Sequence, residues 1–306
     1  MENKKNGGII PAVPDERVLM VPAPCGKCIE CMKKKAREWS IRLQEENKAH
    51  TVALFVTLSF SEDSLRELDR KWQERAKKMH FKQKLNKIDE NEIATIAVRL
   101  FLERYRKKYK KSLRHWLVTE LGSNNTERIH LHGIIYCVTG DTIEKYWQYG
   151  NVWIGDYVNQ KTINYIVKYM YKNDGKHKGY VPKVLCSPGI GSLYTRSVNY
   201  QNMVINKSKI KDQKYRFTNG QYAPLPTYYK NKLYDEDERQ ELWIDKLDQE
   251  VRYIMGERIS IKGNDERDYY ASLSYYQQMN NQLGYGDRTK EWSLKNYKEQ
   301  RKKLQK

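Results

Sequence analysis

Two histidines one residue apart, in the segment RIHLHGIIY (residues 128–136), could do chemistry together. The segment is apolar and rich in isoleucine, which predicts a strand. Side chains two positions apart in a strand point to the same face, so His130 and His132 project together. They are either packing residues or two ligands of one metal ion, and this strand alone does not decide between the two.

A carboxylate joins the histidines if the preceding segment, HWLVTEL (115–121), is a strand paired with theirs. A hairpin centred near residue 125 would place Glu120 opposite His130. Two imidazoles and one carboxylate on one face could hold a divalent cation with open coordination positions. The same alternation sends His115 and Cys137 to the opposite face, so neither is expected as a ligand.

A possible nucleophile lies about 35 residues further on, in TINYIVKYMYK (162–172). Helical spacing predicts a buried stripe of Ile163, Ile166, Val167 and Met170 and an opposite stripe of Tyr165, Lys168, Tyr169 and Lys172. A phenol can attack phosphorus when a nearby cation or metal stabilises the phenolate. The second stripe therefore predicts either a phosphoryl-transfer site or a surface that only binds nucleic-acid backbone.

Three cysteines, Cys25, Cys28 and Cys31, follow the pattern C-x-x-C-x-x-C, which is close to the spacing of metal knuckles. Lys35 stands where an iron–sulfur run would have its fourth cysteine, which argues against such a cluster. The pattern predicts either a structural zinc ion or three reduced thiols. A zinc ion needs a fourth ligand, for which the sequence leaves Cys186, His50 and His177.

The elements that must position these groups fit an α+β domain with an antiparallel central sheet and flanking helices. The predicted order is a helix carrying Ala36, Trp39 and Leu43, a buried strand in 51–60, a helical insertion over 61–111 packed through Ile93, Ile96, Phe101 and Tyr105, strands at 115–121 and 129–138, a helix at 141–149, a strand at 151–158 and a helix at 161–172. We expect a Cys-containing arm and helix at 1–50, the main domain at 51–230 and a helical, basic extension at 231–306.

Charge and aromatic content indicate a polyanionic partner. Lysine and arginine total 57 against 38 acidic residues, a formal charge of +19, and 24 tyrosines and 7 tryptophans offer faces for base stacking. No apolar run reaches the roughly 18 residues of a membrane span, and the first residues lack a signal-peptide core. We therefore expect a cytoplasmic protein that binds nucleic acid and has no membrane partner.

Four blocks together resemble the HUH endonucleases, and specifically the rolling-circle replication initiators of Microviridae, the gokushovirus-type single-stranded DNA phages. The blocks are PCGKCIECMKKKAREWSIR, FVTLSF, TELGSNNTERIHLHGIIY and YIVKYMYK, with SPGIG behind them. The chain departs from the usual family pattern at Leu121 and Ile129, where tyrosine and proline are common. This puts only the local loop shape in doubt, and no block matches beyond about residue 257.

The resemblance implies a ferredoxin-like sheet, related to the RNA-recognition-motif fold, with the histidines on a central strand beside the tyrosine helix. It implies that His130, His132 and Glu120 hold Mg²⁺ or Mn²⁺, that Tyr165 and Tyr169 are the nucleophiles, and that Lys168 and Lys172 match the motif's lysines. The activity expected is nicking and joining of a single-stranded origin in the cytoplasm of a bacterial host, through a 5′-phosphotyrosine link and a 3′-OH primer.

One further expectation concerns the partners of the protein, and two alternatives to this function stay open. The chain lacks a G-x-x-x-x-G-K-[ST] phosphate loop, so a host helicase is needed as well as a host DNA polymerase. One alternative is a plasmid or transposon HUH nuclease. The other is a non-enzymatic DNA-binding or packaging protein that uses its Tyr and Lys faces only for stacking and phosphate contact.

Overall fold

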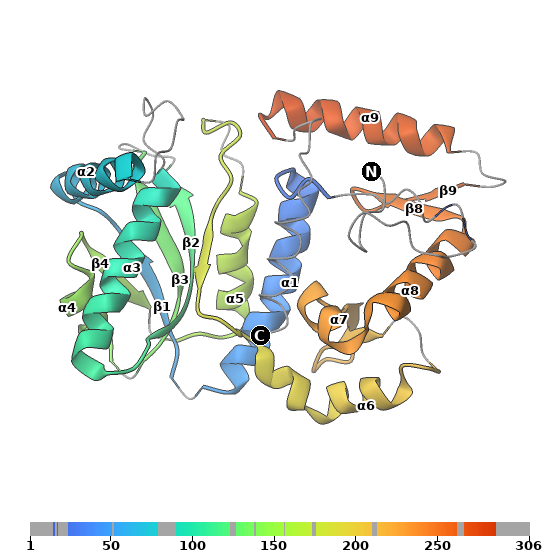
Figure 1. The fold of residues 1–306 in the computed structure, drawn as a ribbon, viewed down its shortest axis with the longest axis horizontal. Coiled ribbons are helices and arrows are strands. Elements are labelled where there is room, and N and C mark those ends of the chain that lie inside the picture. Colours follow the sequence, from blue (N-terminus) through green and yellow to red (C-terminus); the bar gives the residue numbers. More distant parts are fainter. Residues whose placement is uncertain are drawn as a thin grey trace. The chain divides into compact units, whose positions relative to one another are not determined.

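The structure is a computed structural model that describes residues 15, 17, 24–50, 52–78, 90–122, 127–137, 139–155, 157–172, 176–209, 213–261 and 266–285, apart from the side chains of 75–78 and 236. The chain divides into two compact units (Figure 1). Unit 1 contains residues 1–34 and 195–306, and unit 2 contains residues 35–194. Residues 195–230 thus group with the C-terminal part, whereas the sequence placed them with the main domain. The division into domains at 1–50, 51–230 and 231–306 stays a prediction.

Unit 2 is built on a five-stranded antiparallel sheet in the order β4-β1-β3-β2-β5. The strands are β1 (Leu54–Leu58), β2 (Arg114–Leu121), β3 (Ile129–Tyr136), β4 (Val152–Gly155) and β5 (Val184–Cys186). Helices α2 (Glu62–Lys78) and α3 (Glu90–Tyr109) connect β1 to β2, and α4 (Asp141–Trp147) connects β3 to β4. This β-α-β-β-α-β order with β1 and β3 central is the ferredoxin-like arrangement, so the predicted fold class is confirmed.

Helices cover both faces of the sheet (Figure 1). On one face, α3 and α4 pack on the strands through apolar side chains that include Ile93, Ile96, Phe101, Tyr105, Ile143 and Trp147. On the other face lie α1 (Ile29–Lys48) and α5 (Gln160–Val167), through Ala36, Leu43, Ile163 and Ile166. The predicted packing stripes are therefore confirmed.

The tyrosine helix differs from its prediction in its last turn. Asn159 caps α5, because its side chain accepts the Thr162 N–H, and the α-helix ends at Val167. A 3₁₀ turn, Lys168–Met170, follows it. The prediction of a continuous helix to Lys172 is wrong in this part, since tighter 3₁₀ winding replaces the last α-helical turn.

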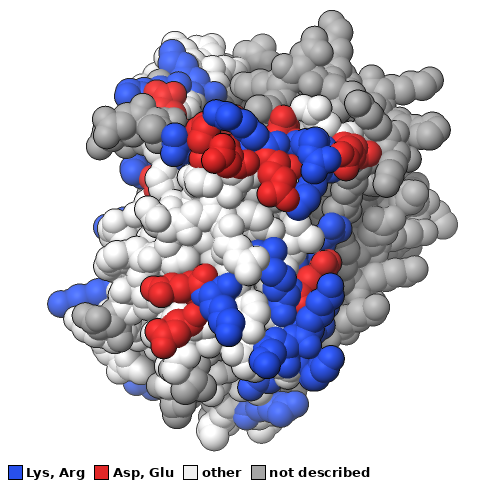
Figure 2. Space-filling view, turned by 90° about the vertical axis from the view of Figure 1, so that its left-hand side faces the viewer, with Lys and Arg blue, Asp and Glu red and all other residues white. Residues whose placement is uncertain are grey.

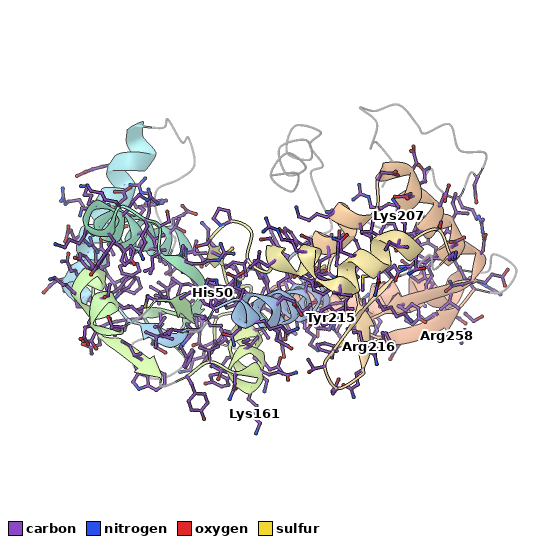
Figure 3. The ribbon with its side chains drawn as sticks, turned by 90° about the horizontal axis from the view of Figure 1, so that it is seen from below. His50, Lys161, Lys207, Tyr215, Arg216 and Arg258 are labelled. Carbon is purple, nitrogen blue, oxygen red and sulfur yellow. The ribbon has the colours of Figure 1, made fainter. Side chains whose placement is uncertain are left out.

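Besides the start of α1, unit 1 contains two hairpins and four α-helices among its described residues, whereas the sequence predicted a helical extension at 231–306. The helices are α6 (Val198–Asn206), α7 (Thr227–Leu233), α8 (Glu236–Asp248) and α9 (Arg267–Gln282). The hairpins are β6–β7 (Lys214–Arg216, Tyr222–Pro224) and β8–β9 (Val251–Ile254, Glu257–Ser260). In β6, Tyr215 is buried and Arg216 is exposed, the alternation of a strand packed on one side (Figure 3).

Surface charge is mixed on α2 and basic at the end of α3. On α2, Arg70 pairs with Glu74 at 2.7 Å, whereas the α3 end exposes Arg106, Lys107 and Lys108. Figure 2 views the molecule from the side that is on the left in Figure 1. On this side, acidic and basic side chains are interleaved near the top, and mainly basic ones lie lower down. None of the described helices is both long and apolar enough to cross a membrane.

Candidate active site

The β2–β3 hairpin has the register that the sequence predicted, with Glu120 opposite His130 and Val118 opposite His132. Ile129, Leu131 and Ile135 pack into the core under α3 and α4, so the two histidines project to the other face. On that face the imidazole rings of His130 and His132 are nearly parallel, with centroids 6.1 Å apart. The shared face proposed for the two histidines is confirmed.

His132 is held on three sides. Its Nδ1 lies 3.0 Å from the Thr57 hydroxyl of β1, and its Nε2 lies 2.8 Å from Oε2 of Glu120. Its ring stacks on the phenol ring of Tyr169, with centroids 4.1 Å apart and planes 5° apart. These contacts bring the histidine strand and the tyrosine segment into direct contact.

The second carboxylate oxygen of Glu120 binds a cation of the tyrosine segment. Lys172 Nζ donates to Oε1 at 2.6 Å, and its ammonium lies 5.6 Å from the centre of the Tyr169 ring. Burial opposes ionisation of Glu120, but its hydrogen bonds with His132 and Lys172 outweigh this effect and lower its pKa. Glu120 is therefore an anion that already attracts a positive charge.

The two tyrosines form a hydrogen-bonded pair, with their phenolic oxygens 2.8 Å apart. Tyr165 is 51% exposed and meets the edge of Phe55, at a centroid distance of 6.4 Å. Tyr169 is half-buried, and burial, the hydrogen bond with Tyr165 and the charge of Glu120 raise its pKa. In this arrangement the Tyr165 phenol is accessible from solvent, and the Tyr169 phenol is held in its neutral form.

His130 is the incompletely satisfied member of the group. Its Nδ1 is buried without a hydrogen-bond partner. Burial and the neighbouring His132 lower its pKa, which favours the neutral imidazole that a metal ion requires. A Cβ atom on Gly122 would lie 2.8 Å from Cε1 of His130, so the glycine leaves room for this ring.

The chemistry of these donors suits a divalent cation, but the present geometry does not gather their atoms around one ion. Two neutral imidazoles and a carboxylate suit Mn²⁺ or a similar ion. Among the described residues, however, the group of His, Cys, Asp or Glu whose ligand atoms all lie within 4.8 Å is Cys25, Cys28 and Cys31. Glu120, His130 and His132 do not form such a group here: Glu120 and His132 are in contact at 2.8 Å, but the His130 ring lies 6.1 Å from that of His132.

The remaining histidines and cysteines have separate surroundings. His115 is buried on the opposite face, as predicted, with Nδ1 near Leu113 O and 3.0 Å from Ser187 Oγ. Cys137 packs beside the core under α3, and Cys186 packs beside the core under α1. His50 and His177 contact carboxylates, Glu46 at 2.8 Å and Glu127 at 3.5 Å. Lys168 is exposed on the 3₁₀ turn.

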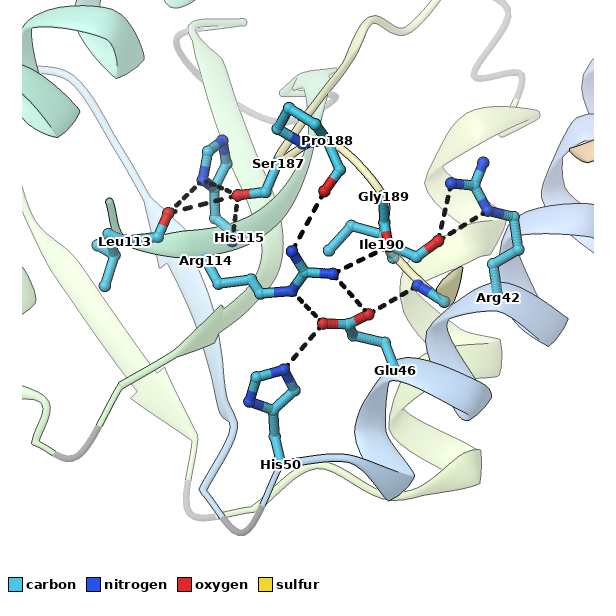
Figure 4. Close-up of polar contacts among 11 residues, drawn as sticks. Arg42, Glu46, His50, Leu113, Arg114, His115, Ser187, Pro188, Gly189 and Ile190 are labelled. Atoms are coloured by element: carbon cyan, nitrogen blue, oxygen red, sulfur yellow. Dashed lines mark hydrogen bonds and ion pairs between the residues drawn. The ribbon is translucent and has the colours of Figure 1, made fainter. Parts of the chain in front are cut away.

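A closed ion network lies at the other end of β2 (Figure 4). Glu46 of α1 binds the Arg114 guanidinium, accepts the Gly191 N–H at 2.7 Å and contacts His50. Arg114 also donates to the carbonyl oxygens of Pro188 and Gly189, and Arg42 donates to that of Ile190. The network thus ties the SPGIG segment to α1 and β2.

Sequence reasoning missed two neighbours of the site, Thr57 and Phe55. Both lie on β1, and Thr57 pairs with His132. A polar residue amid the apolar FVTLSF was the signal that could have found Thr57. Phe55 shares the face of Thr57, because both are two apart in the strand.

Comparison with known proteins identifies the class of this domain. Residues 53–174 match the family model of replication-associated protein ORF2. This segment contains the predicted histidines, tyrosines, lysines and glutamate, and it excludes the cysteine cluster. Residues 53–174 are therefore similar to replication-associated proteins, which confirms the resemblance to replication proteins.

A relative extends the similarity over most of the chain. The replication-associated protein VP4 of Bdellovibrio phage phiMH2K is 22% identical over 285 residues, which cover 83% of this chain and 80% of the relative. No solved structure matches the chain. The chain is thus similar to a phage replication protein along both of its units.

Proposed function

We propose that the protein initiates rolling-circle DNA replication by nicking a single-stranded origin with a tyrosine and later rejoining the strand. The observation that carries this proposal is the direct contact between the Tyr165–Tyr169 pair and His132, which is itself bound to Glu120. A nucleophile, a charged carboxylate and two imidazoles thus lie within one cluster in the segment that matches replication-associated proteins.

In the proposed reaction, a tyrosine oxygen attacks the phosphorus of a phosphodiester, and the bond from phosphorus to the 3′-oxygen breaks. The phenol proton leaves, and the departing 3′-oxygen gains a proton. The products are a 5′-phosphotyrosyl protein and a free 3′-OH that can prime a DNA polymerase. The proton of the attacking phenol passes to solvent water, and the neighbouring phenol can donate a hydrogen bond to the attacking oxygen across their 2.8 Å contact.

The tyrosine segment carries three lysines, Lys161, Lys168 and Lys172. Lys168 is exposed on the 3₁₀ turn and Lys161 points away from the start of α5, where each could bind a backbone phosphate (Figure 3). Mg²⁺ or Mn²⁺ held by Glu120, His130 and His132 would neutralise charge on the scissile phosphate. Lys172 would have to release Glu120 for this, since its ammonium now binds that carboxylate.

Two adjacent phenols also allow rejoining without ATP. The phosphotyrosine bond conserves the energy of the broken phosphodiester, so a 3′-OH can displace the tyrosine and restore the DNA strand. The second phenol is free to cut the regenerated origin while the first holds the displaced strand. A host helicase and polymerase in the bacterial cytoplasm would supply unwinding and synthesis.

The test uses purified protein, Mn²⁺ and a random-sequence pool of single-stranded DNA labelled at its 3′ end. Attack leaves the 3′ label on the protein, so a denaturation-resistant labelled band is expected. The same pool labelled at its 5′ end should give no labelled protein, because that fragment leaves with the 3′-OH. Sequencing the captured DNA would return the preferred cleavage site.

The Tyr165→Phe, Tyr169→Phe double variant should form no adduct. Tyr157→Phe is the matched control, because Tyr157 is 68% exposed in the same unit and lies outside the pair. Undiminished adduct in the double variant would refute the nucleophile assignment. DNA binding without any adduct in the unaltered protein would favour the non-enzymatic binding protein instead.

A further inference from the structure

The three N-terminal cysteines lie close enough to share one ion. Their Sγ atoms all lie within 4.8 Å of one another, and those of Cys25 and Cys31 are 3.9 Å apart. Tetrahedral zinc with Zn–S bonds of about 2.3 Å requires sulfur atoms about 3.8 Å apart. The sulfur ligands of an iron–sulfur cluster bind different iron atoms and are spread further, so the spacing fits a single ion.

The backbone around Cys25 is arranged as in a metal knuckle. The N–H groups of Lys27 and Cys28 both point to Cys25 Sγ, at 3.5 and 3.2 Å. Two N–H donors on one sulfur stabilise it as a thiolate, the form that binds metal. Gly26 makes the turn possible, since its φ of +80° is strained for other residues.

The start of α1 supplies the other two ligands. Cys28 directly precedes the helix, and Cys31 lies in its first turn, where the backbone N–H groups give a positive field. All five cysteines of the chain lie in the described residues, and none is in a disulfide. Three adjacent thiols with no disulfide are difficult to explain as packing residues alone, because each is only half-buried.

We propose that Cys25, Cys28 and Cys31 bind one zinc ion as thiolates and that this ion fastens the N-terminal turn to helix α1. No fourth His, Cys, Asp or Glu joins the group among the described residues. The proposal places a water molecule at the fourth position. The site lies outside residues 53–174, and its test measures bound metal rather than nicking.

The test measures metal in the full chain purified under reducing conditions without chelator. About one zinc per chain is expected, and it should be lost in the Cys25→Ser, Cys28→Ser and Cys31→Ser variants. Cys137→Ser and Cys186→Ser are matched controls that should keep it. Replacement by Co²⁺ should produce thiolate-to-cobalt charge-transfer absorption in the unaltered chain, which does not depend on any variant folding.

Metal removal gives a second readout. Stripping the zinc should lower the Tm of the unaltered chain, and returning Zn²⁺ should restore it, because the ion binds only the folded turn. Purified chain with no zinc that also takes up no Co²⁺ would overturn the proposal. Iron with acid-labile sulfide would overturn it as well, since that result identifies a cluster rather than a single ion.

Discussion

The two ends of strand β2 carry two charged networks that differ in how completely they are satisfied. At the start of the strand, Glu46 is 1% exposed and shares its oxygens among Arg114, His50 and the Gly191 N–H. At its end, Glu120 is bound by Lys172, whose side chain is 47% exposed, and by His132. The first network is closed and holds a loop, whereas the second keeps groups that could exchange partners.

The contrast between the two networks shows that an ion pair can stabilise the fold or can stay available for a reaction, depending on its burial. Breaking a buried ion pair leaves a charge without solvent, so such a pair fixes the structure around it. A pair with an exposed cation can open at little cost, because water replaces the lost contact. The unpartnered Nδ1 of His130 and the exposed phenol of Tyr165 lie only in the open network.

The largest effect on adduct formation should come from His130→Ala, which removes a proposed metal ligand. The variant breaks no hydrogen bond at Nδ1, because that atom has no partner. We expect adduct formation to fall by about a hundredfold or more, with the fold retained by circular dichroism. His115→Ala is the control, because this buried histidine lies on the opposite face of β2 and should matter for stability only. Normal adduct formation by His130→Ala would remove this histidine from the site.

Glu46→Ala should destabilise the fold by about 3 kcal/mol, because it leaves the Arg114 charge without its counter-ion and the Gly191 N–H without its acceptor. Glu120→Ala should cost less than about 1 kcal/mol, since the released Lys172 is about half exposed and can be hydrated. Chemical denaturation of both variants measures the contrast. Equal losses would show that the two networks do not differ as described.

The acid dependence of stability has a defined sign at Glu46. Burial opposes its ionisation, but hydrogen bonds from Arg114 and Gly191 outweigh this and lower its pKa from the ordinary 4.5. A lowered pKa in the folded state stabilises the protein fully above pH 4.5, and that stabilisation is lost as the pH falls through the lowered value. Glu46→Gln should lose this acid dependence, measured as unfolding free energy against pH.

Gly122→Ala should have a smaller effect. The added Cβ would meet Cε1 of His130 at 2.8 Å and shift the imidazole ring. We expect about a tenfold loss of adduct formation and little change in Tm, since misplacing a reacting group costs rate more than stability. Unchanged adduct formation would show that the position of the His130 ring is not critical.

The smallest change expected is a titration shift. Tyr165→Phe removes the hydrogen bond and the like charge that help to raise the pKa of Tyr169. The pKa of Tyr169 should therefore move down, as measured by phenolate absorbance against a Tyr165→Phe, Tyr169→Phe reference. No movement would show that burial alone sets it.

The sheet and the site face were predictable because each depends on periodicity. Alternation in IHLHGIIY separated His130 and His132 from the core residues Leu131 and Ile135, and the assumption of a hairpin centred near residue 125 placed Glu120 opposite His130. Spacing in TINYIVK likewise separated Tyr165 from the buried Ile163 and Ile166.

Other features were not predictable because they depend on contacts between distant segments. The Lys172–Glu120 bond spans 52 positions, and Thr57 reaches His132 across 75. The 3₁₀ turn after Val167 has no marker such as Gly or Pro in YIVKYMYK. The β6–β7 hairpin carries an Asn219–Gly220 turn signal in the sequence. The β8–β9 hairpin instead turns at Met255 and Gly256, which both have positive φ, and this pair is a less obvious turn pattern.

The most direct measurement identifies the residue that becomes linked to DNA. Trypsin cuts after Lys161, Lys168 and Lys172, so it places Tyr165 in peptide 162–168 and Tyr169 in peptide 169–172. Mass spectrometry of the nuclease-trimmed, trypsin-digested adduct should find a phosphate-linked nucleotide on Tyr165 or on Tyr169. A nucleotide on Tyr171, which shares the second peptide, or on any residue outside these peptides would contradict the account.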